Sequence, residues 1–398
     1  MSAVKSPPVT EKQLSSWKLL NRFNSMLEEF GAAVPPSSRE THGLRKLDRR
    51  GYFGLFLLGL FNPVIDSMRG LCAASALAKT RELIGLDGPV GLSSFSGGQQ
   101  VFAPQILEPV LGRMVAESLA RQPGGLKHGR ISPQLIHIFD STLWKVVHRM
   151  DWAKWRKQHV IQRAVRLHVK LRLCDLAPAG TLISAGNICE RAAMRQMLEV
   201  GQFYLGDRNY GADYALFNEL KVKGCGFVLR LNNQAIYEIV ERYPLSAAAL
   251  ADGIVLDATV RLGYRGSGGL QRIVIKQTPQ MKEALILVTS ESPETLDALE
   301  VVGLYRHRWE IEKFFRWLKC LIPCRHWFAE SAGGVTLQIY LCIIMGLLLA
   351  GQLGRKPNKR IKELLDFHQL GWIDDEELAA KVAAEAAARD HRETKKTV

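Results

Sequence analysis

Apolar positions recur along the chain with two different spacings, and the change between them divides the chain into parts. Over residues 1–130 they follow a helical spacing, interrupted by short turns rich in glycine and proline. We therefore expect an all-helical N-terminal domain, compatible with DNA binding but equally with a plain helical bundle. Residues 131–231 instead alternate short apolar runs with helical segments, which predicts the first part of an α/β domain with a mixed sheet.

Residues 232–290 depart from that alternation. They contain β-rich runs at 253–262, 270–278 and 284–289, and no helix long enough to cross over between them. This pattern predicts an antiparallel β insertion inside the α/β domain. Residues 291–353 are expected to complete the domain, beginning with one long helix over 295–321, and 354–398 to form a basic helical tail.

An uncharged segment raises the question of a membrane span. Residues 331–354 carry no charged side chain, and a bilayer core needs about 20 such residues. Gln338 and Gln352 favour a buried core helix instead, because amides are costly to place in lipid. The chain also begins without a secretory signal, and its seven cysteines are an odd number. We expect a cytoplasmic protein that is not anchored in a membrane.

Composition and charge narrow the class of partner. With 398 residues, of which 47% are hydrophobic, the chain can bury a core, which excludes disordered and low-complexity classes. Its 53 Lys and Arg exceed its 39 Asp and Glu, for a net charge of +14. Such an excess predicts a polyanionic partner, either a nucleic acid or an anionic membrane surface.

The location of the charge favours DNA. Residues 141–174 contain nine basic residues and one acidic residue, including Lys154, Arg156 and Lys157. Tryptophans are interleaved with them, Trp144 among these, and could stack on bases or pack the strands. A solvated basic face is the alternative interpretation.

The predicted insertion offers a second basic surface. Arg272 and Lys276 alternate with apolar residues along one predicted strand, so they share a face of it. This pattern is consistent with a sheet that lies against phosphates.

One helix combines polar side chains with an otherwise apolar surface. Within residues 304–321, Tyr305, Arg308, Glu312 and Lys319 recur at spacings that place them on one face. A carboxylate among cations on a largely buried helix is typical of a metal or phosphate site. The alternative is a simple ion pair between Arg308 and Glu312 one helical turn apart.

Two aspartates follow short apolar runs that read as strands. Asp140 comes after LIHIF and Asp207 after QFYLG, the positions where an α/β sheet places functional groups. Taken singly, each is more often a turn or helix-capping residue. Together with Glu312 they form a set of hard oxygen ligands, which suits Mg²⁺ or Mn²⁺ better than zinc.

These motifs resemble a known family. The four polar residues of the helix match Y-x2-R-x3-E-x6-K, the signature of DDE transposases of the insertion-sequence-four type. Residues 207–211 look like the second-aspartate motif of that family, and 139–142 look like the first. The resemblance covers about 130–350. It implies a ribonuclease-H-like catalytic core in which Asp140, Asp207 and Glu312 hold two Mg²⁺ ions, with Mn²⁺ able to substitute.

The resemblance also implies a reaction and its partners. The enzyme would cut double-stranded DNA at transposon ends and join the new 3′-hydroxyl to target DNA, acting as a homodimer in the bacterial nucleoid. The residues implied to contact DNA are Tyr305, Arg308, Lys319, Arg208 and Arg230. In relatives that form a DNA hairpin, an aromatic residue of the β insertion stacks on an extruded base, and Tyr264 is the candidate by position. Two alternatives stay open, namely a nuclease of the same fold without strand joining and a DNA-binding relative without catalysis.

Overall fold

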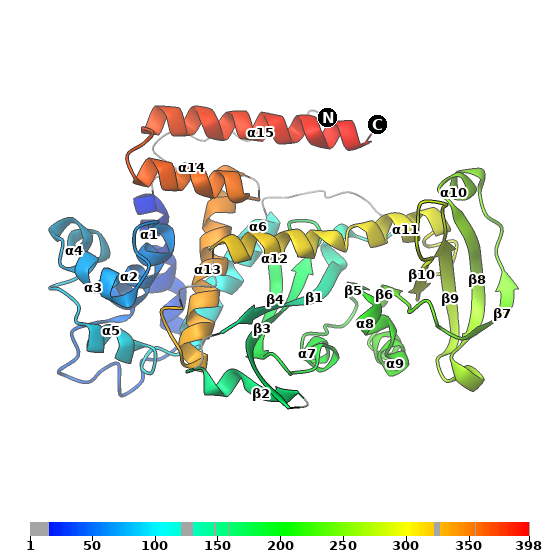
Figure 1. The fold of residues 1–398 in the computed structure, drawn as a ribbon, viewed down its shortest axis with the longest axis horizontal. Helices are drawn as coiled ribbons and strands as arrows, with labels where there is room; N and C mark the ends of the chain where they lie inside the picture. The colour runs from blue at the N-terminus through cyan, green and yellow to red at the C-terminus, as the bar shows by residue number, and fades with distance from the viewer. Residues whose placement is uncertain are drawn as a thin grey trace. The chain divides into compact units, whose positions relative to one another are not determined.

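The computed structural model describes residues 16–120, 130–146, 149–157, 159–321, 327–354 and 356–397, shown in Figure 1. The chain divides into two compact units. We call them the sheet unit, which comprises Leu119–Val146 and Ala153–Phe315, and the helical unit, which comprises Met1–Ser118, Val147–Trp152 and Arg316–Val398. The division differs from the segments expected along the chain, because each unit is assembled from stretches far apart in sequence.

A mixed sheet forms the centre of the sheet unit. Its described strands are ten in number, in the order β2-β3-β1-β5-β6-β10-β9-β8-β7, with β4 paired to β3. The strands are β1 (Ile136–Lys145), β2 (Lys154–Lys157), β3 (Val160–Arg172), β4 (Pro178–Ala185), β5 (Phe203–Gly206), β6 (Gly226–Arg230), β7 (Tyr237–Arg242), β8 (Ile254–Leu262), β9 (Gly269–Lys276) and β10 (Leu285–Thr289).

The core of the sheet carries the parallel strands. β5 pairs in parallel with β1 on one side and with β6 on the other, and the other described pairings are antiparallel. The helices α7 (Glu190–Gln196), α8 (Arg208–Gly211) and α9 (Tyr214–Val222) lie on one side of these strands, and α11 (Ala298–Arg306) lies on the other (Figure 1). The strand and helix alternation expected for this region is therefore present.

The β-rich segment continues the same sheet. β7, β8, β9 and β10 pair antiparallel, as expected, and β10 also pairs with β6 of the core. β7 was not predicted, because its sequence YEIVER carries three charges and forms an exposed edge strand. The short α10 (Ala247–Ala251) separates it from β8.

Two basic residues expected to face phosphates instead form ion pairs with aspartates of the protein. Arg272 is buried and makes a two-pronged ion pair with Asp257, at 2.8 and 2.7 Å, while its Nη1 donates to the carbonyl of Leu296 at 2.7 Å. Lys276 pairs with Asp252 at 2.7 Å. The prediction of a phosphate-facing strand was wrong, because acidic partners distant in sequence already neutralise both charges.

The helix expected over 295–321 is two helices. α11 ends at Arg306 and α12 (Trp309–Leu321) begins three residues later. Between them the amides of His307, Arg308 and Glu310 donate to carbonyls three residues earlier instead of four. This tighter winding interrupts the regular α-helix, but Arg308 still contacts both Tyr305 and Glu312.

The helical unit contains the N-terminal helices together with the C-terminal ones. They are α1 (Ser16–Phe30), α2 (Arg49–Phe61), α3 (Met68–Ser75), α4 (Ala78–Ile84), α5 (Leu92–Gly98), α6 (Glu108–Ala120, whose last two residues belong to the sheet unit), α13 (Ala332–Leu353), α14 (Lys359–Gln369) and α15 (Asp375–Thr397). Within this unit α13 packs against α1 and α2.

α13 is the one helix of the described residues that is long and apolar enough to cross a membrane, and 72% of its most apolar window is buried inside the protein. Gln338 is buried, and its Oε1 accepts a hydrogen bond from the backbone amide of Phe328 at 3.0 Å. A satisfied amide within a protein core costs little, whereas in lipid it would lack a partner. Burial and pairing thus favour the core-helix interpretation.

Candidate active site

Two aspartates lie side by side where the pairing of two parallel strands ends. β1 and β5 are in register at Ile138 and Leu205, and Asp140 and Asp207 each come two residues later. Parallel strands place such side chains at one edge of the sheet. The structure therefore brings together the two aspartates that the strand pattern singled out, and both are partly buried.

Backbone amides orient both carboxylates. Asp140 Oδ1 accepts from the amide of Ser141 at 2.7 Å, and Asp207 Oδ1 accepts from the amide of Asn209 at 2.9 Å. Asp207 thereby caps the short helix α8, the ordinary role for an aspartate after a strand. Capping uses only Oδ1, and among the described residues none donates a hydrogen bond to Oδ2, so the cap and a site role are compatible.

A close backbone contact holds the turn that carries Asp207. A Cβ atom added to Gly211 would lie 1.9 Å from the carbonyl oxygen of Arg230. Only glycine permits this approach, which packs the end of α8 onto β6. The glycine of the Asp-Arg-Asn-Tyr-Gly segment therefore positions Asp207 and Arg230 relative to each other.

The surroundings of Asp140 disfavour the charged form of its carboxyl group. Burial raises the pKa of Asp140 to about 7, and the negative charges of Asp207 and Glu190 add to this effect. The hydrogen bond from Ser141 and the charge of Arg308 oppose the increase. A strongly shifted acid next to a second acid is typical of a functional site.

Arg308 connects the third acidic residue to this pair. Its Nη2 donates to Glu312 Oε1 at 2.5 Å, and its Nη1 lies 3.7 Å from Asp140 Oδ2. The guanidinium also lies 6.0 Å from the ring centre of the buried Tyr305. The ion pair considered as an alternative is present, and it forms part of the site.

The donor set fits a hard divalent cation. Asp140, Asp207 and Glu312 offer carboxylate oxygens, which Mg²⁺ and Mn²⁺ prefer, and a cation would relieve the repulsion at Asp140. Throughout the described part of the chain, however, no three His, Cys, Asp or Glu side chains gather closely enough to hold a metal ion. Arg308 supplies the positive charge between Asp140 and Glu312 in this arrangement.

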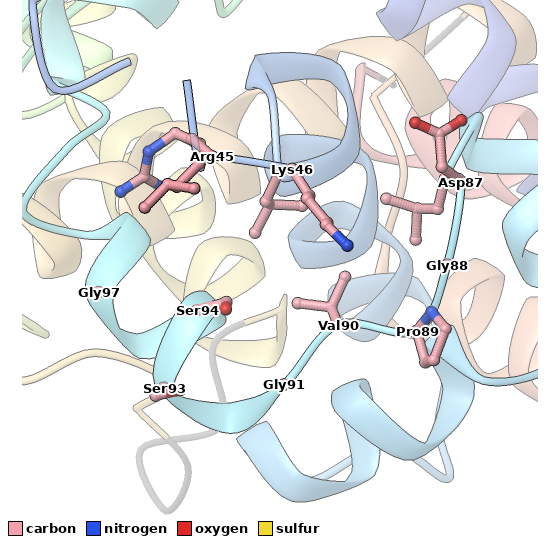
Figure 2. Close-up of a pocket in the computed structure, with 13 residues that line it drawn as sticks. Arg45, Lys46, Asp87, Gly88, Pro89, Val90, Gly91, Ser93, Ser94 and Gly97 are labelled. Atoms are coloured by element: carbon pink, nitrogen blue, oxygen red, sulfur yellow. The ribbon is translucent and has the colours of Figure 1, made fainter. Parts of the chain in front are cut away.

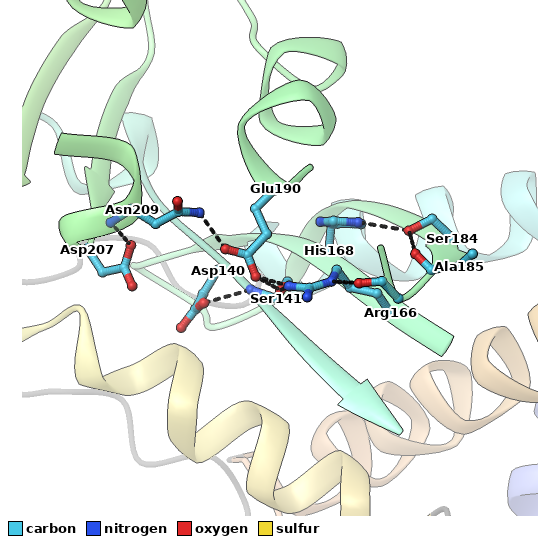
Figure 3. A network of polar contacts seen from close by, with 10 residues as sticks. Asp140, Ser141, Arg166, His168, Ser184, Ala185, Glu190, Asp207 and Asn209 are labelled. Atoms are coloured by element: carbon cyan, nitrogen blue, oxygen red, sulfur yellow. Dashed lines mark hydrogen bonds and ion pairs between the residues drawn. The ribbon is translucent and has the colours of Figure 1, made fainter. Parts of the chain in front are cut away.

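A fourth carboxylate, which the motif analysis missed, lies beside the aspartates. Glu190 is the first residue of α7, and it contacts Ser141, Arg166 and Asn209 (Figure 3). No motif marks it. Its only sequence signal is an acidic residue in the first turn of a helix, which is common at helix N-termini for local reasons.

Two predicted DNA-binding arginines face one acidic partner. Arg208 Nη2 and Arg230 Nη2 lie 3.3 and 3.9 Å from the same Glu283 oxygen. Arg208 is half-exposed, and Arg230 Nε has no hydrogen-bond partner among the residues that the structure describes. Both arginines therefore keep donor capacity beside Asp207.

The basic strand β2 lies at the edge of the sheet. Lys154 and Arg156 are exposed there, whereas the side chain of Lys157 lies outside the described residues. Trp144 is fully buried, so it packs the sheet and does not present its ring to a base. Of the two roles expected for this tryptophan, packing the strands is the one present, because its place on β1 directs the ring into the core.

The two remaining predicted DNA contacts are exposed. Lys319 lies in the last turn of α12, in the part of that helix that belongs to the helical unit. Tyr264, in the turn between β8 and β9, is 67% exposed, and the guanidinium of Arg265 lies 5.2 Å from its ring centre.

Each unit has an open hollow on its surface. One, of about 440 Å³, lies in the sheet unit and is lined by residues that include Trp155, Arg166 and Glu190. The other, of about 370 Å³, lies in the helical unit, where Arg45 and Lys46 line it together with Asp87 (Figure 2). Arg45 Nε already donates to the carbonyl of Arg39 at 2.9 Å.

The family model and the two relatives that match this chain are all described as transposases. A family model described as "Transposase DDE domain" matches residues 131–348, more than half of the chain. "Putative transposase y4zB" of Sinorhizobium fredii (strain NBRC 101917 / NGR234) is 25% identical over 279 residues, which cover 65% of this chain and 75% of that protein. "Probable transposase for insertion sequence element IS5377" of Geobacillus stearothermophilus is 22% identical over 253 residues, which cover 62% of this chain and 64% of that protein.

One solved structure also aligns with most of this chain. It is the cryo-EM structure of the piggyBac transposase synaptic complex with hairpin DNA, with a TM-score of 0.37 and 9% sequence identity. The alignment covers 96% of this chain and 83% of that one.

Proposed function

The chain belongs to the transposase DDE domain family and acts in DNA transposition, and from this premise we propose the chemistry it performs. We propose that it cuts DNA at transposon ends and joins the new 3′-hydroxyl to target DNA. The Y-x2-R-x3-E-x6-K spacing further supports the insertion-sequence-four type. The β1-β5-β6 core with its flanking helices is compatible with the ribonuclease-H-like arrangement implied by that resemblance.

The observation that carries the proposal is the meeting of two aspartates from distant parts of the chain, with a third acidic residue linked to one of them through an arginine. Asp140 and Asp207 meet through the β1–β5 register, and Glu312 is joined to Asp140 through Arg308. We propose that Asp140, Asp207 and Glu312 hold two Mg²⁺ ions, which Mn²⁺ can replace. Bound there, the ions would activate the attacking hydroxyl and stabilise the leaving oxygen of the DNA strand.

Arg308 has two roles in this proposal. Without metal it neutralises Glu312 and Asp140, and we propose that it leaves Glu312 when the carboxylates take up cations. A guanidinium released in this way is suited to a DNA phosphate, because its planar donors match phosphate oxygens. Tyr305 supports the guanidinium from one side through its ring.

Other cations are proposed to hold the DNA backbone. Arg208 and Arg230 adjoin Asp207 and share only one acidic partner, Glu283. Lys154 and Arg156 extend positive charge along the edge strand β2, and we keep Lys157 and Lys319 as proposed contacts on the basis of the sequence. Such contacts position DNA without reading its sequence.

The remaining parts of the proposal concern assembly and cellular location. We propose that a homodimer holds two transposon ends together, as the resemblance implies, and that it acts on DNA in the bacterial cytoplasm. The residues before 131 are proposed to help bind the transposon end. Arg45 and Lys46 line a hollow in that part and give it local positive charge.

The test uses the full-length protein and plasmid DNA that carries the gene with its flanking sequences. Cleavage at the element ends is measured with Mg²⁺, and joining is measured with a labelled, pre-cut 3′-hydroxyl end. We expect both reactions from the wild type and neither from Asp140→Asn. Cleavage without joining would make the protein a nuclease, and DNA binding without either reaction would make it a non-catalytic relative.

A further inference from the structure

Glu190 is a partly buried carboxylate to which the proposed chemistry gives no role. It lies at the start of α7, in the sheet unit, and Figure 3 shows its carboxylate between Asn209 on one side and Ser141 on the other. Both of its oxygens accept hydrogen bonds. Oε1 accepts from Ser141 Oγ at 2.5 Å and from Arg166 Nη1, and Oε2 accepts from Asn209 Nδ2 at 2.5 Å.

The residues that Glu190 holds are the same ones that orient the two aspartates. Ser141 donates its backbone amide to Asp140 Oδ1, and Asn209 donates its backbone amide to Asp207 Oδ1. One intervening residue therefore connects each aspartate to Glu190. The backbone amide of that residue donates to the aspartate, and its side chain donates to Glu190. The two connections leave from different oxygens of a single carboxylate.

Arg166 anchors this carboxylate. Its Nη1 donates to Ser141 Oγ at 2.8 Å as well as to Glu190, and its Nε donates to the carbonyl of Gly186 at 3.1 Å. Arg166 comes from β3, which pairs with β1 beside the aspartates. The guanidinium is thus held at three points and offsets the negative charge of Glu190.

We propose that Glu190 is a positioning residue that ties strand β1 at Asp140 to the turn of Asp207 and so sets the separation of the two carboxylates. The proposal rests on the proposed function, because the separation matters only where both aspartates bind the same cations. Residues that orient metal ligands in this way affect metal affinity by about 10- to 100-fold.

The geometry predicts how substitutions differ. Alanine at position 190 removes both connections, so the aspartates lose their common anchor. Glutamine keeps the shape and the acceptor for Ser141 and Arg166. Its Nε2 can donate to Asn209 Oδ1 once the Asn209 amide is rotated, because that rotation exchanges the donor of Asn209 for its acceptor. Glu190→Gln should therefore recover most of what Glu190→Ala loses.

The experiment measures Mn²⁺ binding by calorimetry, with full-length protein and no DNA. Wild type, Glu190→Ala, Glu190→Gln and Asp140→Asn are compared, and Glu219→Ala is the matched control. Glu219 is a glutamate of the same unit, on α9, and it pairs with Arg195 at 2.6 Å. We expect about 10- to 100-fold weaker binding in Glu190→Ala, near-wild-type binding in Glu190→Gln and in the control, and loss of binding in Asp140→Asn.

A second comparison tests whether Glu190 acts through its hydrogen bonds with Ser141 and Asn209. In a Ser141→Ala/Asn209→Ala background both connections are already broken, so Glu190→Ala should have little further effect on Mn²⁺ affinity. If Glu190→Ala alone fails to fold, this double variant, which leaves Glu190 paired with Arg166, takes its place in the comparison with wild type.

The outcomes separate this inference from the function on which it rests. Wild-type Mn²⁺ binding that depends on Asp140 but not on Glu190 would overturn the positioning role and leave the proposed function intact. The same holds if Glu190→Gln binds as weakly as Glu190→Ala, since the charge and not the connection would then matter. A wild type with no Asp140-dependent Mn²⁺ site would overturn both.

Discussion

Arg308 holds Glu312 in an ion pair of 2.5 Å and reaches to 3.7 Å from Asp140 with its other terminal nitrogen. One guanidinium thus links two acidic residues that are far apart in the sequence. It also occupies the position between two of the three side chains that we propose to bind metal. Arg308 therefore offsets part of the negative charge of this site, and several consequences can be measured.

The first prediction concerns Glu312→Gln. This change removes a ligand charge and keeps the shape of the side chain, so cleavage should fall by about 100-fold or more, equivalent to about 3 kcal/mol in the transition state. DNA binding should be retained, because the basic residues are unchanged. Plasmid cleavage with Mg²⁺ and a gel-shift measurement of binding check the two halves separately, and a variant that still cuts at the wild-type rate would remove Glu312 from the metal site.

The second prediction concerns the DNA phosphates and Arg308. Arg308→Ala should weaken binding of a pre-cut transposon end by about 10-fold or more, because a charge-assisted hydrogen bond contributes about 1.5–3 kcal/mol. Arg306→Ala is the matched control, since Arg306 lies two residues earlier and pairs with Asp252 at the surface. Equal affinity in wild type and Arg308→Ala would reduce Arg308 to a partner of Glu312.

The third prediction concerns pH and follows from the pKa of about 7 at Asp140. A carboxylate must lose its proton to bind a cation, so Mn²⁺ affinity should increase as the pH rises from 6 to 8. Calorimetric titrations at several pH values test this, with release of protons on binding near pH 6. Affinity that is constant over this range would contradict the pKa assigned to Asp140.

The Asp140 carboxyl group also makes the stability of the protein without metal depend on pH. Stability changes with pH in the opposite direction to Mn²⁺ affinity. The pKa of this group is near 3.9 in an unfolded chain and about 7 in the folded one, so between these values the folded state binds more protons. The free energy of unfolding should therefore fall as pH rises from about 4 to 7. Asp140→Asn should remove this contribution. The difference between the two proteins in urea unfolding with a chelator isolates it from other groups such as His137.

The fourth prediction concerns the turn that carries Asp207. Gly211→Ala would place a Cβ atom 1.9 Å from the carbonyl oxygen of Arg230, so we expect a loss of about 2–4 kcal/mol in unfolding free energy. Gly303→Ala is the control, because that glycine of α11 has no neighbour within 4 Å of the added atom. It should be neutral or stabilising, as alanine favours helix. Denaturant unfolding measures both.

The fifth prediction concerns the basic edge strand. Lys154→Ala/Arg156→Ala should weaken DNA binding uniformly across sequences and reduce the slope of log affinity against log salt by about two. Arg242→Ala, on the opposite edge strand β7, provides a comparison in the same unit. A salt slope unchanged in the double variant would favour the solvated-face interpretation of the charged run.

The elements of the fold could be predicted where local pattern decides them. Alternating and continuous apolar runs predicted most of the strands from β1 to β10, because the backbone pleat exposes every second residue to one face. They missed the polar edge strands β2 and β7, whose sequences KWRK and YEIVER carry little apolar signal. The break between α11 and α12 was also missed, since no proline or glycine marks it.

The sequence by itself determined which acidic residues to consider and why they belong together. Asp140 and Asp207 follow apolar strands, Glu312 stands in a spaced motif, and these signals lie within a few residues of each group. Such signals are local because helix and strand periodicity repeats over a few residues.

Only the tertiary structure decided how charge is balanced around those residues. It placed Glu190 against Ser141, 49 residues away in sequence, and it buried Arg272 against Asp257 instead of leaving it for phosphate. Ion pairs of this kind depend on which strands become neighbours and on how deeply each side chain is removed from water. Neither quantity is contained in a short stretch of sequence, so the partners of Glu190 and Arg272, and the approach of Arg308 to Asp140, emerge only when the sheet is assembled.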